Sequence, residues 1–353
     1  MKGLDRYIAR TVWWSILLVL LVIVGIDALS AFIDEADDRS DAYGFAQIGQ
    51  YVLLTIPGRC YEFIPFAALI GSLIGLGQLA SSSELVVMRA AGVSNLRLVW
   101  TVLQQAVVIA LLGFLLGEYV APAAEQRAQS GRALALYADQ QLGQEQGVWR
   151  RDGRRFLHAR AVSSEGRIFG VTLYEFDEGG WLERVLFADS GRYRNDGWAL
   201  RDVVISRFGR DPGVSRDQQD AMYLPSNITP QILELENVAP SQLALRDLWG
   251  YATFLRTQGE DPVEFELATW KKLLQPAAVA ALVLLAVSFV FGPLRDGTLG
   301  FRIFAGVMVG VLFRLSQDLL GPASLVFGFP PFYAAAVPVA LSILIGIFLL
   351  RRV

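Results

Sequence analysis

The chain has 353 residues, 54% of them hydrophobic, and a formal net charge of −3. Soluble domains are usually less apolar, and the slightly negative charge gives no reason to expect nucleic-acid binding. Cys60 is the single cysteine, which excludes an intrachain disulfide. His158 is the single histidine, so the His/Cys clusters of common zinc sites are also excluded. The composition predicts a membrane protein with no metal or other cofactor.

Six segments are long and apolar enough to cross a bilayer as helices, which takes about 20 residues. They cover approximately residues 11–33, 60–80, 98–121, 268–292, 299–321 and 331–350. The first exceeds the core of a signal peptide and has no cleavage site, so we expect it to be retained. The stretch FAQIGQYVLLTIPG precedes the second span and predicts another helix, which Pro57 kinks or separates.

Basic residues predict the orientation of these spans, because Lys and Arg favour the cytoplasmic ends of membrane helices. With six spans, the basic residues near the span ends fall on one side, and the acidic stretch DEADDRSD falls on the other. The basic set is Lys2, Arg6, Arg10, Arg89, Arg97, Arg295, Arg302, Arg351 and Arg352. We therefore expect both termini and residues 81–98 to be cytoplasmic.

Residues 122–265 hold most of the charge, which predicts a polar domain inserted between two membrane halves, 1–121 and 266–353. By the orientation above, we expect this domain to lie on the outer side of the membrane. From about residue 241 the pattern becomes helical, and Ser241 is a candidate N-cap.

The inserted domain reads as β structure over most of its length. Three strand-like runs are each interrupted by a pair of turn residues. The pairs are Asp152-Gly153, Gly179-Gly180 and Asp196-Gly197, which suit tight hairpins. Short strands at this spacing favour a sandwich or a jellyroll-like domain.

A short apolar segment, SSSELVVMRAAGVSN, connects the second and third spans. Ser81 and Glu84 have the spacing of a capping box, Gly92 is a candidate stop and Ser94 a second N-cap. These signals predict an isolated helix over 82–91 that is apolar on nearly every side.

Such a helix should be buried, and two interpretations remain open. In one, Glu84 only caps the helix, which lies in the membrane interface. In the other, the helix couples the spans to a cytoplasmic ATPase, and Glu84 pairs with a basic residue there. The chain has no G-x-x-x-x-G-K-[ST] phosphate loop, so an ATPase of that kind would be a separate protein.

Several segments, in this order, resemble the LptF/LptG permease family over essentially the whole chain. They are LDRYIAR, SSSELVVMRAAG, GEYVAP, FVFGPLRDGTLGFR and GPASLVFGFPP. The ELVVMRAAG and FGPLR blocks look more like the LptG branch.

This resemblance implies a non-catalytic permease subunit of an ABC transporter in the inner membrane of Gram-negative bacteria. The transporter extracts lipopolysaccharide from the outer leaflet and passes it to a periplasmic bridge of β-jellyroll domains. The implied partners are an LptF-like second permease, two copies of an LptB-like ATPase that hydrolyses the ATP, and an LptC-like bitopic protein. By position, residues 82–91 match the coupling helix of the permeases in this family, the helix that contacts the ATPase. Its candidate coupling residues are Glu84, Leu85, Met88 and Arg89.

Asp27 lies deep in the first span, where an ionised side chain costs about 2.5–3.5 kcal/mol on insertion scales. It should therefore face a cavity or a partner, or be held by a neighbouring helix. Family members can carry a lysine near the outer end of this span, where the nearest match is Ala31.

Five more charged residues are candidates for contact with the lipid. Arg314 and Asp318 are four residues apart on one helix face, so they either neutralise one another or leave Arg314 for an anionic head group. Arg59, Glu62 and Glu118 lie near the outer ends of their spans. A lipid head group would arrive at that depth, but a wet interface explains the three residues equally well.

Two other functions compete with transport. A lipid-modifying membrane enzyme would need clustered ionisable groups, for which Asp27, Glu62 and Asp318 are available. No nucleophile–base or metal pattern joins them. A scaffold that only displays its β domain predicts no ATPase partner and no role for Glu84.

Overall fold

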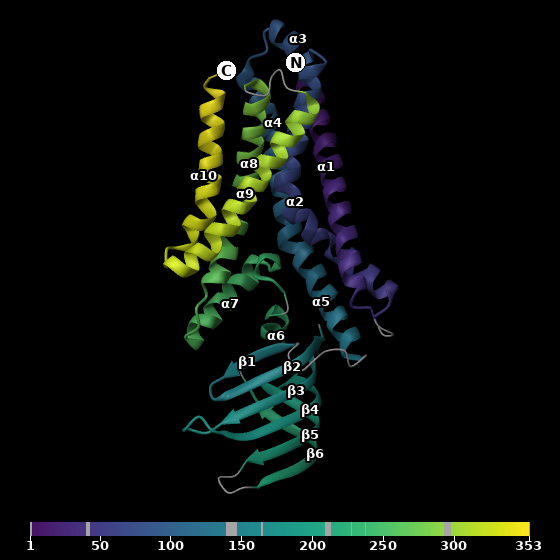
Figure 1. Cartoon of the computed structure of the whole chain (residues 1–353), viewed down its shortest axis with the longest axis vertical. Coiled ribbons are helices and arrows are strands. Elements are labelled where there is room, and N and C mark those ends of the chain that lie inside the picture. The colour runs from purple at the N-terminus through teal and green to yellow at the C-terminus, as the bar shows by residue number, and fades with distance from the viewer. Residues whose placement is uncertain are drawn as a thin grey trace. The chain divides into compact units, whose positions relative to one another are not determined.

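The computed structural model describes residues 2–39, 43–138, 147–163, 165–208, 213–226, 228–236, 238–292 and 298–352 (Figure 1). The chain divides into two compact units. The helical unit consists of Met1–Ser30, Ile56–Pro122 and Pro240–Val353. The second unit, which contains the sheet, consists of Ala31–Thr55 and Ala123–Ala239.

Ten α-helices occur in the described residues, and six helical segments are long and apolar enough to cross a membrane. The N-terminal helices are α1 (Lys2–Ala36), α2 (Phe45–Ser81), α3 (Glu84–Ala90), α4 (Asn95–Leu115) and α5 (Ala121–Ala138). A π-helical turn, Leu116–Val120, joins α4 to α5. The C-terminal helices are α6 (Pro230–Glu236), α7 (Leu245–Gln258), α8 (Val263–Phe291), α9 (Leu299–Phe327) and α10 (Pro331–Leu350). With the sheet inserted between them, these helices confirm the predicted fold.

The second span differs from the prediction, because α2 runs unbroken from Phe45 to Ser81. Pro57 and Pro65 both lie inside it, so the expected separation at Pro57 is wrong. A proline removes one backbone hydrogen bond from a helix, but neighbouring helices make this tolerable in an apolar bundle. The result is a single long second span.

The core of the helical unit forms where α2 packs among α1, α4, α8 and α9. Leu69, Leu73 and Leu76 are fully buried on α2 at helical spacing. Gly71 and Gly75 lie against α1, and a Cβ atom on Gly71 would be 2.5 Å from the Cα atom of Ile16. This G-x-x-x-G pair therefore permits a close approach of the two helices.

The sheet has six antiparallel strands in sequence order, the topology of a meander. They are β1 (Val148–Asp152), β2 (Arg155–Ser163), β3 (Arg167–Phe176), β4 (Leu182–Arg194), β5 (Gly197–Phe208) and β6 (Val214–Pro225). The sequence led us to expect a sandwich or a jellyroll-like domain. The described strands form one sheet, in which each strand pairs with the next along the chain. One face carries the core, in which Leu157, Leu173, Leu186 and Ile205 lie opposite one another across four strands and are all buried.

The hairpin turns are close to the predicted dipeptides. Asp152 pairs with Arg155, so Gly153 starts the first turn, with φ of +62°. In the β4–β5 hairpin Arg194 pairs with Gly197, so the turn is Asn195–Asp196, one residue earlier than predicted. Both turn residues have positive φ, which Asn and Asp tolerate better than most residues.

Two other local features differ from the sequence prediction. Strand β6 lies outside the three strand-like runs of the sequence, because it is exposed from Val214 to Ala221 and its buried residue, Leu224, comes near its end. Helix α7 begins at Leu245 with Ala244 as N-cap, whereas Ser241 lies in a preceding 3₁₀ turn, Pro240–Gln242. The predicted N-cap at Ser241 is therefore wrong.

Candidate functional site

The helix between α2 and α4, α3, has one face on the bundle and one face exposed. Leu85 and Met88 are buried in the core of the helical unit. Val86 and Val87 are 56% and 66% exposed. Figure 1 shows α3 at the end of the helical unit where both termini lie. The segment therefore presents an uncovered apolar face, and Leu85 and Met88 anchor it to the bundle.

The start of α3 differs from the predicted capping box. Ser81 ends α2, and Ser83 is the N-cap of α3 in a left-handed conformation, without a side-chain capping bond. The capping box between Ser81 and Glu84 is therefore wrong. Instead, the hydroxyl of Ser82 donates a 2.9 Å hydrogen bond to Oε1 of Glu84.

The end of α3 agrees with the prediction. Gly92 has φ of +87°, and its amide donates to the carbonyl of Arg89. The next amide, of Val93, donates to the carbonyl of Met88. These two bonds form a Schellman motif. Ser94 then caps α4 by accepting a bond from the amide of Arg97, so both predicted signals are confirmed.

Glu84 and Arg89, the two charged coupling candidates, lie in different environments. Glu84 is partly buried and interacts with the hydroxyl of Tyr7 on α1 as well as with Ser82. Arg89 is exposed near the last turn. Glu84 is therefore bound by Ser82 beside it, while part of its surface stays accessible.

Asp27 forms an ion pair with Arg59, which joins α1 to α2 inside the apolar bundle. The two side chains are 34% and 21% exposed. Pairing neutralises the charge that an isolated carboxylate would bring into the span. The structure thus places a basic partner beside Asp27 on the next helix.

Arg314 lies between two carboxylates. Its guanidinium group is 2.6 Å from Glu62 of α2 and 2.9 Å from Asp318 of its own helix. Lys271 of α8 lies close enough to interact electrostatically with Asp318 and Arg314. All three members of the ion-pair group are about half exposed. A cationic or an anionic ligand therefore has access to this group and can replace one of its ion pairs.

The carboxylate of Glu118 interacts with two groups, the ammonium group of Lys272 and a backbone amide of α7. Nζ of Lys272 is 3.1 Å from its carboxylate and donates to the carbonyls of Gly117 and Leu243, at 2.7 Å each. The same carboxylate accepts the amide of Leu245, the first residue of α7, at 3.0 and 3.1 Å. Because Lys272 is only 3% exposed, this cluster is a structural connection between the π-helical turn, α7 and α8.

Arg302 makes a second buried connection, between α9 and α2. Its side chain is buried and Nη1 donates a 2.6 Å bond to the carbonyl of Gly77. Gly77 is in the last turns of α2, immediately before α3. The arginine thus helps to fix the base from which α3 extends.

The six predicted lipid-contact residues form three ion-pair groups. Sequence reasoning missed Lys271 and Lys272, although consecutive lysines in the apolar stretch TWKKLLQPAAV were an available signal. In the described part of the chain, no three His, Cys, Asp or Glu side chains come together as a metal site. The site is thus built from ion pairs and an exposed helix face.

A family model described as "Lipopolysaccharide export system permease LptF/LptG" matches residues 6–352. The chain is 34% identical over 352 residues to the Escherichia coli K12 protein named lipopolysaccharide export system permease protein LptG. It is 36% identical over 354 residues to the protein of the same name in Haemophilus influenzae. Each alignment covers 99% of this chain and 98% of the relative. The chain therefore belongs to the LptF/LptG family of lipopolysaccharide export permeases.

Proposed function

We propose that this chain is a permease subunit of an ATP-driven transporter that extracts lipopolysaccharide from the outer leaflet of the inner membrane. It passes the lipid to a periplasmic bridge toward the outer membrane. The main observation that supports this proposal is the family match over residues 6–352. The match includes both membrane halves and the inserted sheet. Relatives of nearly the same length are named as permeases of this export system.

The proposed topology places both termini and α3 in the cytoplasm and the β domain in the periplasm. It divides the chain into a first membrane half (1–121), a β domain (122–265) and a second membrane half (266–353). Six candidate spans return the chain to its starting side, and the basic residues near the termini and α3 favour the cytoplasm.

Helix α3 is the proposed coupling element. Its exposed valines would enter an apolar groove of an LptB-like ATPase, and Glu84 would pair with a basic group at the rim. Burial of Leu85 and Met88 supports this role, because a helix anchored on the bundle can transmit the motion of its partner. Two ATPase copies would drive this subunit and an LptF-like second permease.

The subunit itself is proposed to be non-catalytic, with ATP hydrolysis in the separate ATPase. An LptC-like bitopic protein is the further proposed partner. The six candidate spans support a membrane-embedded transport subunit.

The ion pairs suggest how lipid would be recognised. Arg59 and Arg314 are the proposed contacts for lipid phosphates, since guanidinium groups suit that geometry. Asp27, Glu62 and Asp318 would be their counter-ions when no lipid is bound. Glu118 has a structural role in this proposal, because buried Lys272 and the start of α7 occupy its carboxylate.

Native mass spectrometry of the complex, released gently from its own membranes, tests this function. The expected assembly contains this chain, a second six-span protein, two ATPase copies and a bound phosphorylated multi-acyl lipid. Recovery of the chain alone, or as a homo-oligomer without an ATPase, contradicts the proposal.

A further inference from the structure

The first turn of α1 binds the first turn of α4 through a forked ion pair. Nε of Arg97 is 3.2 Å from Oδ1 of Asp5, and its Nη2 is 2.7 Å from Oδ2. A guanidinium group that donates to both oxygens of a carboxylate fixes the orientation of the two side chains. The pair lies at the end of the helical unit where α3 and both termini are found (Figure 1).

Arg97 is joined to α3 by a short and well-fixed connection. Only residues 91–94 separate α3 from α4. The Schellman motif after α3 and the cap that Ser94 gives to α4 hold both ends of this connection. A cation in the first turn of a helix is unfavourable with the helix dipole, so α4 alone does not explain Arg97, whereas its pair with Asp5 does. A displacement of α3 must therefore carry Arg97 with it.

A second polar contact joins the same two helices about two turns further into the bundle. Nε1 of Trp13 on α1 donates a 2.7 Å hydrogen bond to Oε1 of Gln105 on α4. Both contacts join residues that are 92 positions apart in the chain. Equal separations at two points along a pair of helices mean that the helices run parallel and side by side. We therefore expect α1 to follow the motion of α4.

Helix α1 is suited to carry such a motion across the membrane. It has 35 residues, which corresponds to a length of about 52 Å. Trp14, Leu18 and Leu21 are 63%, 61% and 70% exposed, so the described helical unit leaves one side of α1 uncovered. A long helix that is open on one side can tilt as a rigid body when its first turn is displaced.

We propose that Asp5 and Arg97 are positioning residues for transport, whose ion pair passes a displacement of α3 through the first turn of α4 to α1. The inference rests on the proposed function, in which the ATPase docks on α3, and adds which span follows that helix. Loss of the pair should uncouple α1 without releasing the ATPase, because the docking surface stays on α3. Since the two side chains are 32% and 35% exposed, the pair contributes little to stability, and its loss should leave the fold intact.

The test uses the assembled complex in nanodiscs loaded with lipopolysaccharide. The measurements are retention of the ATPase, the rate of ATP hydrolysis and the lipopolysaccharide released per ATP hydrolysed. Asp5→Asn should keep the ATPase and lower the release per ATP about fivefold or more, the lower end of the usual coupling between two sites. Asp5→Arg and Arg97→Asp should each have the same effect. Combining these two substitutions should restore release, because the pair forms again with its charges exchanged.

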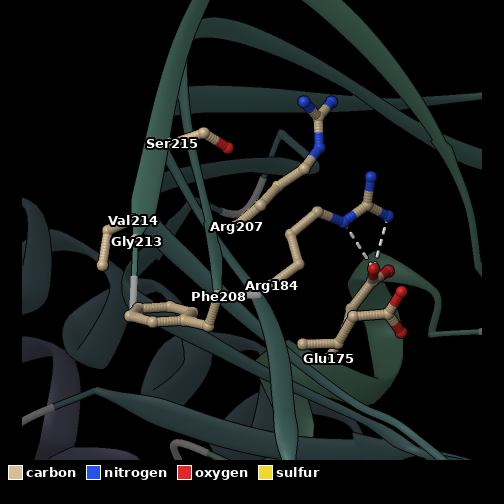
Figure 2. Close-up of a pocket in the computed structure, with 8 residues that line it drawn as sticks. Glu175, Arg184, Arg207, Phe208, Gly213, Val214 and Ser215 are labelled. Carbon is tan, nitrogen blue, oxygen red and sulfur yellow. Dashed lines mark hydrogen bonds and ion pairs between the residues drawn. The ribbon is translucent and has the colours of Figure 1, made fainter. Parts of the chain in front are cut away.

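Two substitutions of arginine by lysine supply a matched comparison. Arg97→Lys should release an intermediate amount of lipid, since lysine keeps the charge without the fork. Arg184→Lys makes the same change in the sheet, where Figure 2 shows two donors of Arg184 on the carboxylate of Glu175. Those two residues are directly opposite one another on β3 and β4, so the backbone ladder already fixes their separation. Arg184→Lys should therefore leave the release per ATP unchanged.

Thermal unfolding of each variant checks its fold and makes the outcomes decisive. Wild-type release per ATP in a folded Asp5→Asn variant that retains the ATPase refutes the inference and leaves docking on α3 intact. A double variant that releases no more lipid than the single variants refutes it as well. A wild-type chain that retains no ATPase contradicts the proposed function and this inference with it.

Discussion

Lys272 and Glu118 form a buried ion pair 3.1 Å apart, and the pair holds three backbone segments together. The lysine binds carbonyls of the π-helical turn and of the residues before α7, while the glutamate accepts the first amide of α7. A carboxylate at a helix N-terminus also interacts favourably with the helix dipole. The pair therefore fixes the start of α7 against the π-helical turn and α8.

Lys272→Met should destabilise the chain strongly, because it leaves the carboxylate of Glu118 and two carbonyls without their buried partner. Removing one member of a buried pair typically costs about 3–5 kcal/mol. The measurement is thermal unfolding of the purified chain in detergent, followed by tryptophan fluorescence.

The neighbouring lysine gives a matched control for this substitution. Lys271 is less buried and interacts with Asp318 at longer range, so Lys271→Met should lower the melting temperature much less. Combining Lys272→Met with Glu118→Gln should cost less than the sum of the two single changes, since both remove the same pair. Equal effects of the two lysine substitutions would show that the cluster has no special structural role.

Glu84→Ala should reduce lipid-stimulated ATPase activity, or retention of the ATPase, in the assembled complex. The reason is loss of the carboxylate proposed to pair with a base on the partner. Asp220→Ala, an exposed carboxylate on β6, is the control and should leave both quantities unchanged. Wild-type activity and assembly with Glu84→Ala would remove the coupling role of this residue.

The two faces of α3 should respond differently to the same substitution. Val87→Asp places a charge on the exposed face, so it should weaken ATPase retention and leave the melting temperature of the isolated chain nearly unchanged. Leu85→Asp places a charge in the core, so it should lower that melting temperature. The two measurements are co-purification of the ATPase and thermal unfolding. Normal ATPase retention with Val87→Asp would exclude the exposed face as the docking surface.

The six spans and most of the sheet were predictable because their signals are local. Apolar runs of sufficient length mark the helices, and turn dipeptides mark the hairpins. The end of α3 followed from Gly92 and Ser94 for the same reason. Its start did not, because α2 continues to Ser81 and Ser83 becomes the N-cap of α3.

The partners of the charged residues could not be predicted, because they come from distant parts of the sequence. Asp27 pairs with Arg59 of the next helix, and Glu118 with Lys272 of the other membrane half. The spacing of Arg314 and Asp318 placed them on one helix face, where they do pair, yet the third member, Glu62, is on another helix. Local pattern thus identified the candidates, and packing decided which charges neutralise one another.

Gly71→Ala should destabilise the helical unit, because the added Cβ atom would lie 2.5 Å from the Cα atom of Ile16. Backbone cannot move aside as a flexible side chain can, and overpacking of this kind typically costs about 1–3 kcal/mol. Gly25→Ala on α1 is the matched control, since nothing lies within 4 Å of its added Cβ atom. There the better helix propensity of alanine should leave stability unchanged or raise it slightly. Thermal unfolding of both variants in the same detergent checks the contrast. Equal melting temperatures would mean that α1 and α2 are not in close contact at Gly71.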